Sequence, residues 1–153
     1  MKITRNVIEK IFSHARIEYP KECCGIITGK DGVNQTIHQC SNIQDSLYEK
    51  EPNTYLWDSS IAYTIDRKEA QEIFKQAKQN GQTILAFYHS HPDHNAFFST
   101  VDKAAQTVFG EPEFPDAAHI IVSVRNGTVI DTKCYKWNSD IADFVESALE
   151  IVF

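Results

Sequence analysis

Residues 83–102 read "TILAFYHSHPDHNAFFSTVD" and combine a strand signal with a helix signal. The first seven residues are apolar and β-branched or aromatic almost throughout, which is typical of a strand buried on both faces. Pro92 cannot donate a hydrogen bond to a sheet, so it predicts the end of that strand. Ser99 then opens a helix that we expect to run through about Val108. The stretch therefore predicts a central strand, a loop at residues 90–98 and a helix.

Further elements are predicted on the N-terminal side of this stretch. Thr4 is placed to cap a first helix, and Pro20 ends that helix. A buried strand from Cys23 to Gly29 and a second strand from about Val33 to Cys40 flank a turn at residues 30–32. The first part of the chain therefore predicts a helix followed by a β-hairpin.

The connection from this hairpin to the central strand is less regular. Residues 41–57 show no clean period, so we expect a loop with one short extended piece. A long helix is expected to start at Asp58 or Ser59 and to reach Asn80, because Asn80 and Gly81 form a helix stop.

Two strands and a last helix are predicted after the central strand. Residues 117–137 predict two strands joined at Asn126-Gly127, a strong hairpin signal. A final helix capped near Ser139 is expected to have one apolar face, formed by Ile141, Phe144, Val145, Ala148, Leu149 and Val152. The whole pattern predicts an α/β fold, in the sense of an α+β mixed sheet flanked by helices.

Composition and charge narrow the classes of function. The 153 residues suffice for a single domain, 1–153, with a proper core. The formal net charge is −6 and no basic run occurs, which argues against a nucleic-acid partner. The first residues interleave charged and apolar side chains, unlike a secretory signal or a membrane span. We therefore expect a cytoplasmic protein with no membrane partner.

The four cysteines do not have the spacing of a zinc site. Cys23 and Cys24 are adjacent, so on a strand they point to opposite faces, and no CxxC pair occurs. We expect these two, together with Cys40 and Cys134, to be small buried hydrophobic residues.

His89 and His91 are the first candidates for chemistry. Side chains two apart on a strand project from the same face, so both imidazoles can converge at the open end of the strand. Asp102 would add an anionic ligand, and this set suits Zn²⁺ with a fourth position open to water. The alternatives are two half-exposed histidines at a strand end and a capping box made by Ser99 and Asp102. The capping box is compatible with metal binding and explains neither histidine.

A peptidase at this site also needs a group that transfers protons. Glu22 lies between the first helix and the buried strand, so it can reach the same sheet edge, although an acid in a loop is usually solvated. His14, His38 and His119 fall inside predicted elements, and we expect them to be structural.

The loop beside these candidates leaves two alternatives open. His94 is next to the proposed metal site, where it would have a substrate-binding role or a supporting role. Phe97 and Phe98 would form either a substrate flap or part of the packed core.

Taken together, these residues resemble the signature of the JAMM (JAB/MPN) zinc metalloprotease family. That signature is an upstream Glu followed by H-[ST]-H-P-x6-S-x2-D, which stands here as "HSHPDHNAFFSTVD" at residues 89–102. The segment "YPKECCGIITG" at residues 19–29 is similar to the part of small prokaryotic members that carries the Glu. The resemblance covers essentially the whole chain and implies a fold like that of cytidine deaminases. The deaminase zinc signature itself is absent.

The resemblance implies a role for each matched residue. His89, His91 and Asp102 would bind Zn²⁺, with one ion per chain. Glu22 would be the general acid and base, and Ser99 would stabilise the oxyanion.

The resemblance also implies a substrate. Family members hydrolyse the amide bond after the C-terminal glycine of a ubiquitin-like protein, in deconjugation or precursor processing, including bacterial ubiquitin-like and antiphage pathways. The partner would be a ubiquitin-like or sulfur-carrier protein with a Gly-Gly-type C-terminus. The alternatives are sulfur-carrier processing for cysteine or thio-cofactor biosynthesis, a non-catalytic MPN-type binding scaffold, and hydrolysis of small peptides or amino-acid amides. The oligomeric state stays open.

Overall fold

A six-stranded sheet forms the centre of the computed structural model, which describes residues 1–153. The strands lie side by side in the order β3-β2-β4-β7-β8-β9. Their bounds are β2 (Cys24–Gly29), β3 (Gln35–Cys40), β4 (Thr83–Pro92), β7 (Ala118–Arg125), β8 (Thr128–Asn138) and β9 (Asp143–Ser147). All neighbours are antiparallel except β4 and β7, which run parallel. The mixed sheet confirms the predicted fold class.

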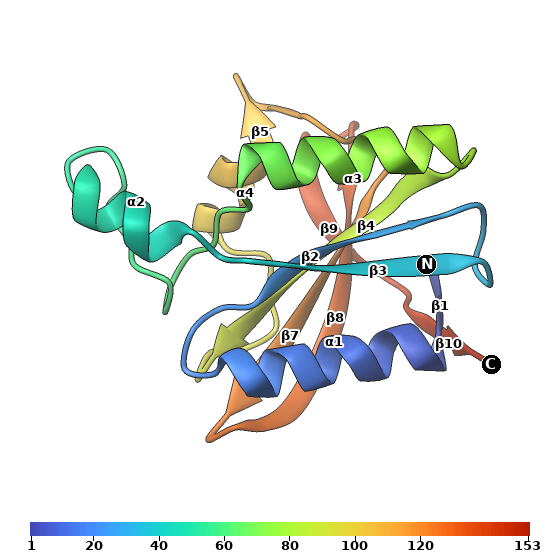
Figure 1. Cartoon of the computed structure of the whole chain (residues 1–153), viewed down its shortest axis with the longest axis horizontal. Coiled ribbons are helices and arrows are strands. Elements are labelled where there is room, and N and C mark those ends of the chain that lie inside the picture. Colours follow the sequence, from blue (N-terminus) through green and yellow to red (C-terminus); the bar gives the residue numbers. More distant parts are fainter.

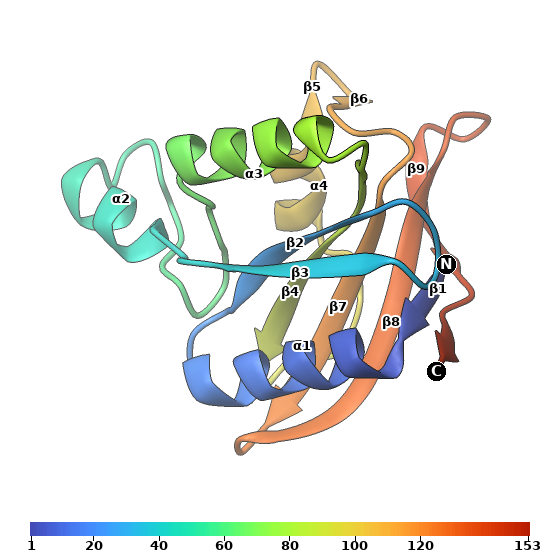
Figure 2. The ribbon, with the colours of Figure 1, turned by 45° about the vertical axis from the view of Figure 1, so that its right-hand side comes forward.

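Helices cover both faces of this sheet. Helix α1 (Arg5–Glu18) lies on one face and α3 (Arg67–Gln79) on the other, as Figures 1 and 2 show. Along β4, Tyr88 belongs to the core under α1, and Phe87 belongs to the core under α3. The central strand is therefore buried on both faces, as its unbroken apolar run predicts.

The cysteines follow the same alternation. Cys23 lies in the core on the α1 side and Cys24 in the core on the α3 side. These two, Cys40 and Cys134 are all buried and free of disulfide bonds. The prediction that they are buried hydrophobic residues is confirmed.

One cap and one turn behave as local sequence predicts. The Thr4 hydroxyl accepts a hydrogen bond from Val7 N at 3.3 Å and starts α1. Asn126 and Gly127 both have positive φ, 48° and 73°, which suits the tight hairpin between β7 and β8. Gly25 in β2 is required by packing, because a Cβ there would collide with the Tyr88 ring and the His38 carbonyl.

The segment between β3 and β4 differs from the prediction. Residues 41–57, expected to be a loop, contain the short helix α2 (Gln44–Lys50), and the expected extended piece is a single bridge between Asn42 and Ile65. The long helix predicted from Asp58 or Ser59 begins only after Asp66, whose side chain accepts from Glu69 N.

Side-chain hydrogen bonds explain why residues 58–66 are not helical. Asp58 accepts from Ser60 N, while the N–H and hydroxyl of Ser59 are bonded to Asp45. Asn42 donates to Ala62 O and accepts from Thr64 N. These bonds occupy backbone groups that a helix would need, and tertiary contact overrides the helical period.

The predicted C-terminal helix is wrong. The chain turns at Ala142, which has φ 51°, and then forms β9 and β10 (Glu150–Val152). Strand β9 pairs with β8 and buries Phe144 against Trp137 and Phe98. The unpaired edge of β8 decides the local structure, because a short amphipathic pattern fits a strand once a partner strand is available.

Two small sheets complete the molecule. Strand β1 (Lys2–Thr4) pairs in parallel with β10, and β5 (Thr107–Val108) pairs with β6 (Glu111–Pro112). None of the helices combines the length and the apolar character needed to span a bilayer.

Candidate metal centre

The crossover from β4 to β7 creates the site. Two parallel strands cannot be joined by a tight turn, so the chain leaves the end of β4 and crosses through α4 (Thr100–Gln106). Ser99 is the N-cap of α4: its Oγ accepts from Asp102 N at 3.0 Å, and its N–H donates to Asp102 Oδ2 at 2.9 Å. The predicted capping box is present, and it holds the Asp102 carboxylate on the strand side of the helix.

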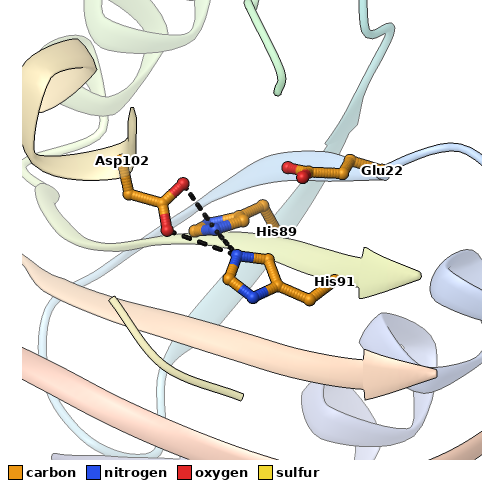
Figure 3. A group of neighbouring side chains, drawn as sticks. All are labelled: Glu22, His89, His91 and Asp102. Carbon is orange, nitrogen blue, oxygen red and sulfur yellow. Dashed lines mark hydrogen bonds and ion pairs between the residues drawn. The ribbon is translucent and has the colours of Figure 1, made fainter. Parts of the chain in front are cut away.

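Four buried side chains from three parts of the chain meet here. Glu22, His89, His91 and Asp102 offer ligand atoms that all lie within 4.8 Å of one another (Figure 3). His89 Nε2 lies 3.1 Å from Asp102 Oδ1, and His91 Nε2 lies 3.2 Å from Asp102 Oδ2. The two Nε2 atoms are 3.1 Å apart. Figure 3 shows the histidines on β4 facing Asp102 on α4, with Glu22 nearby.

The orientation of His91 is set by its second nitrogen. His91 Nδ1 lies 2.8 Å from Asn95 O, and a carbonyl oxygen only accepts, so Nδ1 carries the hydrogen. In the neutral ring, Nε2 then presents a lone pair to the centre of the cluster. The His89 ring is held differently, by stacking on Tyr63 at 4.6 Å between centroids.

The donor set fits a zinc ion. Tetrahedral zinc with bonds of about 2.0–2.1 Å separates neighbouring ligand atoms by roughly 3.3 Å, close to the separations of 3.1 and 3.2 Å between these nitrogen and carboxylate atoms. Nitrogen lone pairs and a carboxylate that face one another in a buried space repel unless a cation or protons lie between them. These four residues therefore form a cluster able to hold a metal ion.

The backbone around Glu22 is held by three hydrogen bonds. Glu22 N donates to Ser59 O at 2.7 Å, and Asn42 Nδ2 donates to Glu22 O at 3.0 Å. Cys23 N donates to Ser90 Oγ at 2.8 Å. The carboxylate itself is buried, and its Oε1 has no hydrogen-bond partner. A buried, unpartnered acid on a fixed backbone is rare outside functional sites.

The pKa values of the two carboxylates in the cluster are shifted in opposite directions. Burial, and secondly repulsion from Asp102, hold the pKa of Glu22 well above its usual range. Burial alone would raise the pKa of Asp102 too, but the attraction of His89 and the hydrogen bonds with His89 and His91 outweigh it. The pKa of Asp102 is therefore well below its usual range. Glu22 is thus suited to carry a proton, and Asp102 is suited to stay ionised.

Two recesses open onto the cluster. A groove of about 650 Å³ runs along α4 and reaches Asp102, between Ala104 and Ala105 on one side and residues 54–57 on the other. A smaller recess of about 140 Å³ is lined by Glu22, Ile61, His91, His94, Phe97, Ser99 and Val101. Asp102 lines the groove, and Glu22 and His91 line the smaller recess, so both spaces reach the cluster.

Three supporting residues were not identified from sequence. Ser90 lies between the two histidines and points to the opposite face, where its Oγ binds the residue that follows Glu22. Asn42 and Tyr63 come from the irregular segment before α3, and only the tertiary structure brings them to the site. The "HSH" pattern places Ser90 between the two candidate ligands and could have indicated its role. No sequence pattern indicates a role for Asn42 or Tyr63.

Three further histidines, His14, His38 and His119, lie in packed surroundings. His14 Nδ1 contacts Tyr88 OH at 2.8 Å, and His38 Nε2 contacts Thr28 Oγ1 at 2.9 Å. His119 is buried and stacks on Phe87. These contacts agree with the structural roles expected for the three residues.

The two phenylalanines of the loop divide between the two alternatives. Phe98 is partly buried and packs on the buried Phe144, with ring centroids 4.2 Å apart, which favours the packing alternative for this residue. Phe97 is 47% exposed and meets the His91 ring edge-on, so it lies at the entrance of the smaller recess.

Comparisons with known proteins agree with this geometry. The model of the family described as "Prokaryotic homologs of the JAB domain" matches residues 4–136. The CysO-cysteine peptidase of Mycobacterium tuberculosis is 24% identical over 134 residues, which are 88% of this chain and 80% of that protein. The desampylase of Haloferax volcanii is 28% identical over 110 residues, which are 67% of this chain and 70% of that protein.

Solved structures share the fold. A protein from Desulfitobacterium hafniense has a TM-score of 0.71 and 22% identity, covering 99% of this chain and 92% of its own. A structure described as "JAMM: A Metalloprotease-like Zinc Site in the Proteasome and Signalosome" has a TM-score of 0.55 and 20% identity, covering 100% of this chain and 98% of its own.

Proposed function

The chain belongs to the family of prokaryotic JAB-domain homologues, the JAMM metallopeptidases, and on that premise we propose that it is a zinc-dependent peptidase of a ubiquitin-like protein. The bond cleaved is the amide or isopeptide bond after the C-terminal glycine of that protein. The observation that carries this proposal is the buried four-residue cluster with one carboxylate, Glu22, left without a partner.

We propose that His89, His91 and Asp102 hold one zinc ion per chain. The convergence of their ligand atoms supports this assignment. A bound zinc ion supplies Lewis-acid polarisation of a carbonyl and lowers the pKa of water at its open position.

Glu22 is the proton-transfer group in this proposal. Its carboxylate takes a proton from the attacking water, whose oxygen forms the new bond to the glycine carbonyl carbon. The C–N bond then breaks, and Glu22 returns the proton to the departing nitrogen, so that atoms and charges balance. The raised pKa of Glu22 favours this role, because burial makes its carboxylate a stronger base than a solvated one and so a better acceptor for the proton of water.

Ser99 stabilises the oxyanion in this proposal. Its Oγ already accepts a hydrogen bond from Asp102 N, which leaves the hydroxyl hydrogen available to donate. Ser99 also lines the smaller recess beside Glu22 and His91. A donor fixed in advance by a helix cap needs no reorganisation when negative charge develops on the carbonyl oxygen.

The groove along α4 suits the extended tail of a small protein. Its volume of about 650 Å³ is several times that of the smaller recess. Ala104 and Ala105 are exposed and contribute only methyl groups to its lining, which leaves room for a bound chain beside α4. Opposite them lie Leu56 and Trp57, which are 63% and 43% exposed and provide apolar contact area. Asp102 lines the groove, so a terminal glycine bound there would meet the cluster.

The named relatives support a small-protein partner. One is a CysO-cysteine peptidase and one a desampylase, so processing of a sulfur-carrier protein is an alternative to deconjugation of a ubiquitin-like one. We place the reaction in the cytoplasm, within a ubiquitin-like or antiphage pathway or within cysteine or thio-cofactor synthesis. A non-catalytic scaffold would have no need for a buried acid such as Glu22.

We propose that residues 1–153 form one domain. The family match ends at residue 136, yet the last strands pack within the same molecule. Strand β9 extends the central sheet beside β8, and β10 pairs with β1.

The test uses the purified protein and a ubiquitin-like protein whose Gly-Gly tail is fused to a short C-terminal extension. Zinc-loaded wild type is expected to release the extension, and Glu22→Gln is expected to keep one zinc per chain and lose about 10²–10⁴ in rate. Near wild-type cleavage by Glu22→Gln would refute the role of Glu22. A zinc content well below one per chain that added zinc does not restore would favour the scaffold.

A further inference from the structure

The tripeptide Asp93-His94-Asn95, which we call the DHN loop, is fixed on every side. Asp93 adopts a left-handed conformation with φ 59°, which is strained for a residue with a side chain. Its carboxylate accepts from Tyr19 OH at 2.7 Å and from Asn126 N at 3.2 Å, and its N–H donates to Val124 O at 2.7 Å. Two separate segments, one after α1 and one at the end of β7, therefore hold the first residue of the loop.

The rest of the DHN loop is held by the end of β7. Arg125 donates through Nη2 to Asn95 Oδ1 at 2.8 Å and through Nη1 to Asp93 O at 3.3 Å. Ser123 Oγ donates to His94 O. Asn95 O in turn accepts from His91 Nδ1. The loop is thus a rigid support that joins β7 to the cluster.

One side chain of the DHN loop takes no part in this network. The imidazole of His94 makes no hydrogen bond or ion pair with the protein, although its backbone is anchored. It is exposed, and it lines the smaller recess together with Glu22 and Ser99. A strained loop held by so many contacts, with a single unused polar side chain beside the reacting groups, points to a binding role for that side chain.

The position of Glu22 tells which part of the substrate enters this recess. Glu22 lines the smaller recess and not the groove along α4. In the proposed reaction Glu22 returns its proton to the departing nitrogen, so that nitrogen must lie on the recess side. The glycine tail then occupies the groove, and the leaving group occupies the recess.

Building on the proposed function, we propose that His94 binds the α-carboxylate of a single small amino acid that leaves as the free amine. The recess, at about 140 Å³, is well below the size of pockets for larger ligands. Ile61, Phe97 and Val101 give it apolar walls, which leaves His94 as its only polar side chain outside the proposed catalytic and metal-binding residues. An imidazole has an N–H donor in either protonation state, and the α-carboxylate lies one carbon from the departing nitrogen.

A lysine side chain would use the recess differently. An isopeptide-linked lysine brings a long apolar stem and no carboxylate close to the departing nitrogen, so His94 would have no anion to bind. The two kinds of leaving group can therefore be separated by experiment. The proposal favours removal of one C-terminal residue over deconjugation.

The experiment compares three synthetic probes with a common Gly-Gly tail. The first ends in serine with a free carboxylate, the second in serine carboxamide, and the third is joined to the side-chain nitrogen of Nα-acetyl-lysine amide. Zinc-loaded wild type, His94→Leu and His94→Gln are compared by kcat/KM, and binding without turnover is measured by titration calorimetry in the Glu22→Gln background.

Wild type is expected to prefer the free acid over the carboxamide by about tenfold or more, the usual effect of one charge-assisted hydrogen bond. That ratio should approach one in His94→Leu and be partly retained in His94→Gln, with the same order in the binding constants. An equal rate for acid and carboxamide in wild type, or an unchanged ratio in His94→Leu, would overturn the inference. Efficient cleavage of the lysine probe alone would overturn it and leave the proposed function standing. No cleavage or binding of any probe would count against both.

Discussion

Ser90 Oγ accepts a hydrogen bond from Cys23 N at 2.8 Å, so the serine between the two histidines holds the residue that follows Glu22. A second hydrogen bond joins the same two residues, because Ser90 N donates to Cys23 O at 3.1 Å. Two segments that lie far apart in the sequence are thus joined at the site. The strand that carries the two histidines and the segment that carries Glu22 are therefore held together by two hydrogen bonds.

Removing this contact should lower turnover without removing zinc. Ser90→Ala leaves the buried Cys23 N–H unpaired, which should cost about 1–3 kcal/mol in the free energy of unfolding. Because Glu22 is then less well placed, we expect kcat to fall by roughly tenfold or more. Zinc content should stay at one per chain, since Ser90 points away from the histidines.

Thr28→Val provides a matched control for Ser90→Ala. Thr28 is also buried in the sheet, but it lies at the end of β2 away from Glu22, where its hydroxyl contacts His38 and Gln82. The Thr28→Val variant should lose a similar amount of unfolding free energy and keep the kcat of wild type. Equal losses of kcat in both variants would mean that Ser90 acts only through stability.

Zinc should stabilise the protein through Asp102. A ligand that binds only the folded state at about 100 times its Kd adds about 2.7 kcal/mol to the free energy of unfolding. Adding zinc to metal-free wild type should therefore raise Tm, and chelation should reverse the rise. Asp102→Asn should abolish the response, measured by calorimetry with and without zinc.

Asp143→Asn is the control for this prediction. Asp143 is half-exposed and pairs with Lys103 Nζ at 3.1 Å, outside the cluster. Its loss should leave the zinc response intact. A zinc-dependent rise in Tm that survives Asp102→Asn would exclude Asp102 as a ligand.

The charge on Glu22 should destabilise the metal-free protein at neutral pH. The pKa of Glu22 is raised in the folded state by burial and by Asp102, so folding favours its protonated form. The penalty is absent below the unfolded pKa of about 4.3 and grows as pH rises above it. Glu22→Gln should therefore stabilise metal-free protein at pH 7, and this gain should shrink as pH falls toward the unfolded pKa of about 4.3. A gain that does not depend on pH would contradict this cause.

Acid should destabilise the fold through His119. Burial, and secondly repulsion from His89, lower the pKa of His119 to about 3. Between pH 6.5 and about 3 the unfolded chain therefore binds a proton that the folded chain does not, and stability falls as pH falls. His119→Leu should reduce this dependence by roughly 2–4 kcal/mol over that range.

The slope of the unfolding free energy against pH is the relevant measurement for His119→Leu. A change in packing shifts the whole curve, whereas loss of a titrating group changes its slope. Both proteins should be measured free of metal by denaturant unfolding. Parallel curves would show that His119 does not carry the acid sensitivity.

Filling the groove along α4 should weaken substrate binding alone. Ala105 is exposed on the groove side of α4, so Ala105→Trp should raise KM for a Gly-Gly-tailed protein by about tenfold. Zinc content should not change. Gln79→Trp, which adds the same ring at an exposed position at the end of α3, is the control. An unchanged KM in Ala105→Trp would place the tail elsewhere.

Local sequence by itself determined the elements whose signals lie within a few residues. The unbroken apolar run of β4, the caps at Thr4 and Ser99 and the turn at Asn126-Gly127 all appear in the structure. The spacing of His89 and His91 likewise determined that both face the same side. These features depend on backbone geometry and short-range hydrogen bonds, which the local sequence specifies.

Tertiary structure alone decided the rest. The C-terminal segment became β9 because β8 offered an unpaired edge, and residues 58–66 stayed irregular because Asn42 and Asp45 took their hydrogen bonds. The burial of Glu22, which removes water and raises its pKa, depends on contacts with Ser59 and Asn42 from that same segment. Sequence specified the candidate ligands, whereas long-range packing brought them together, since no local pattern encodes the distance between separate strands and helices.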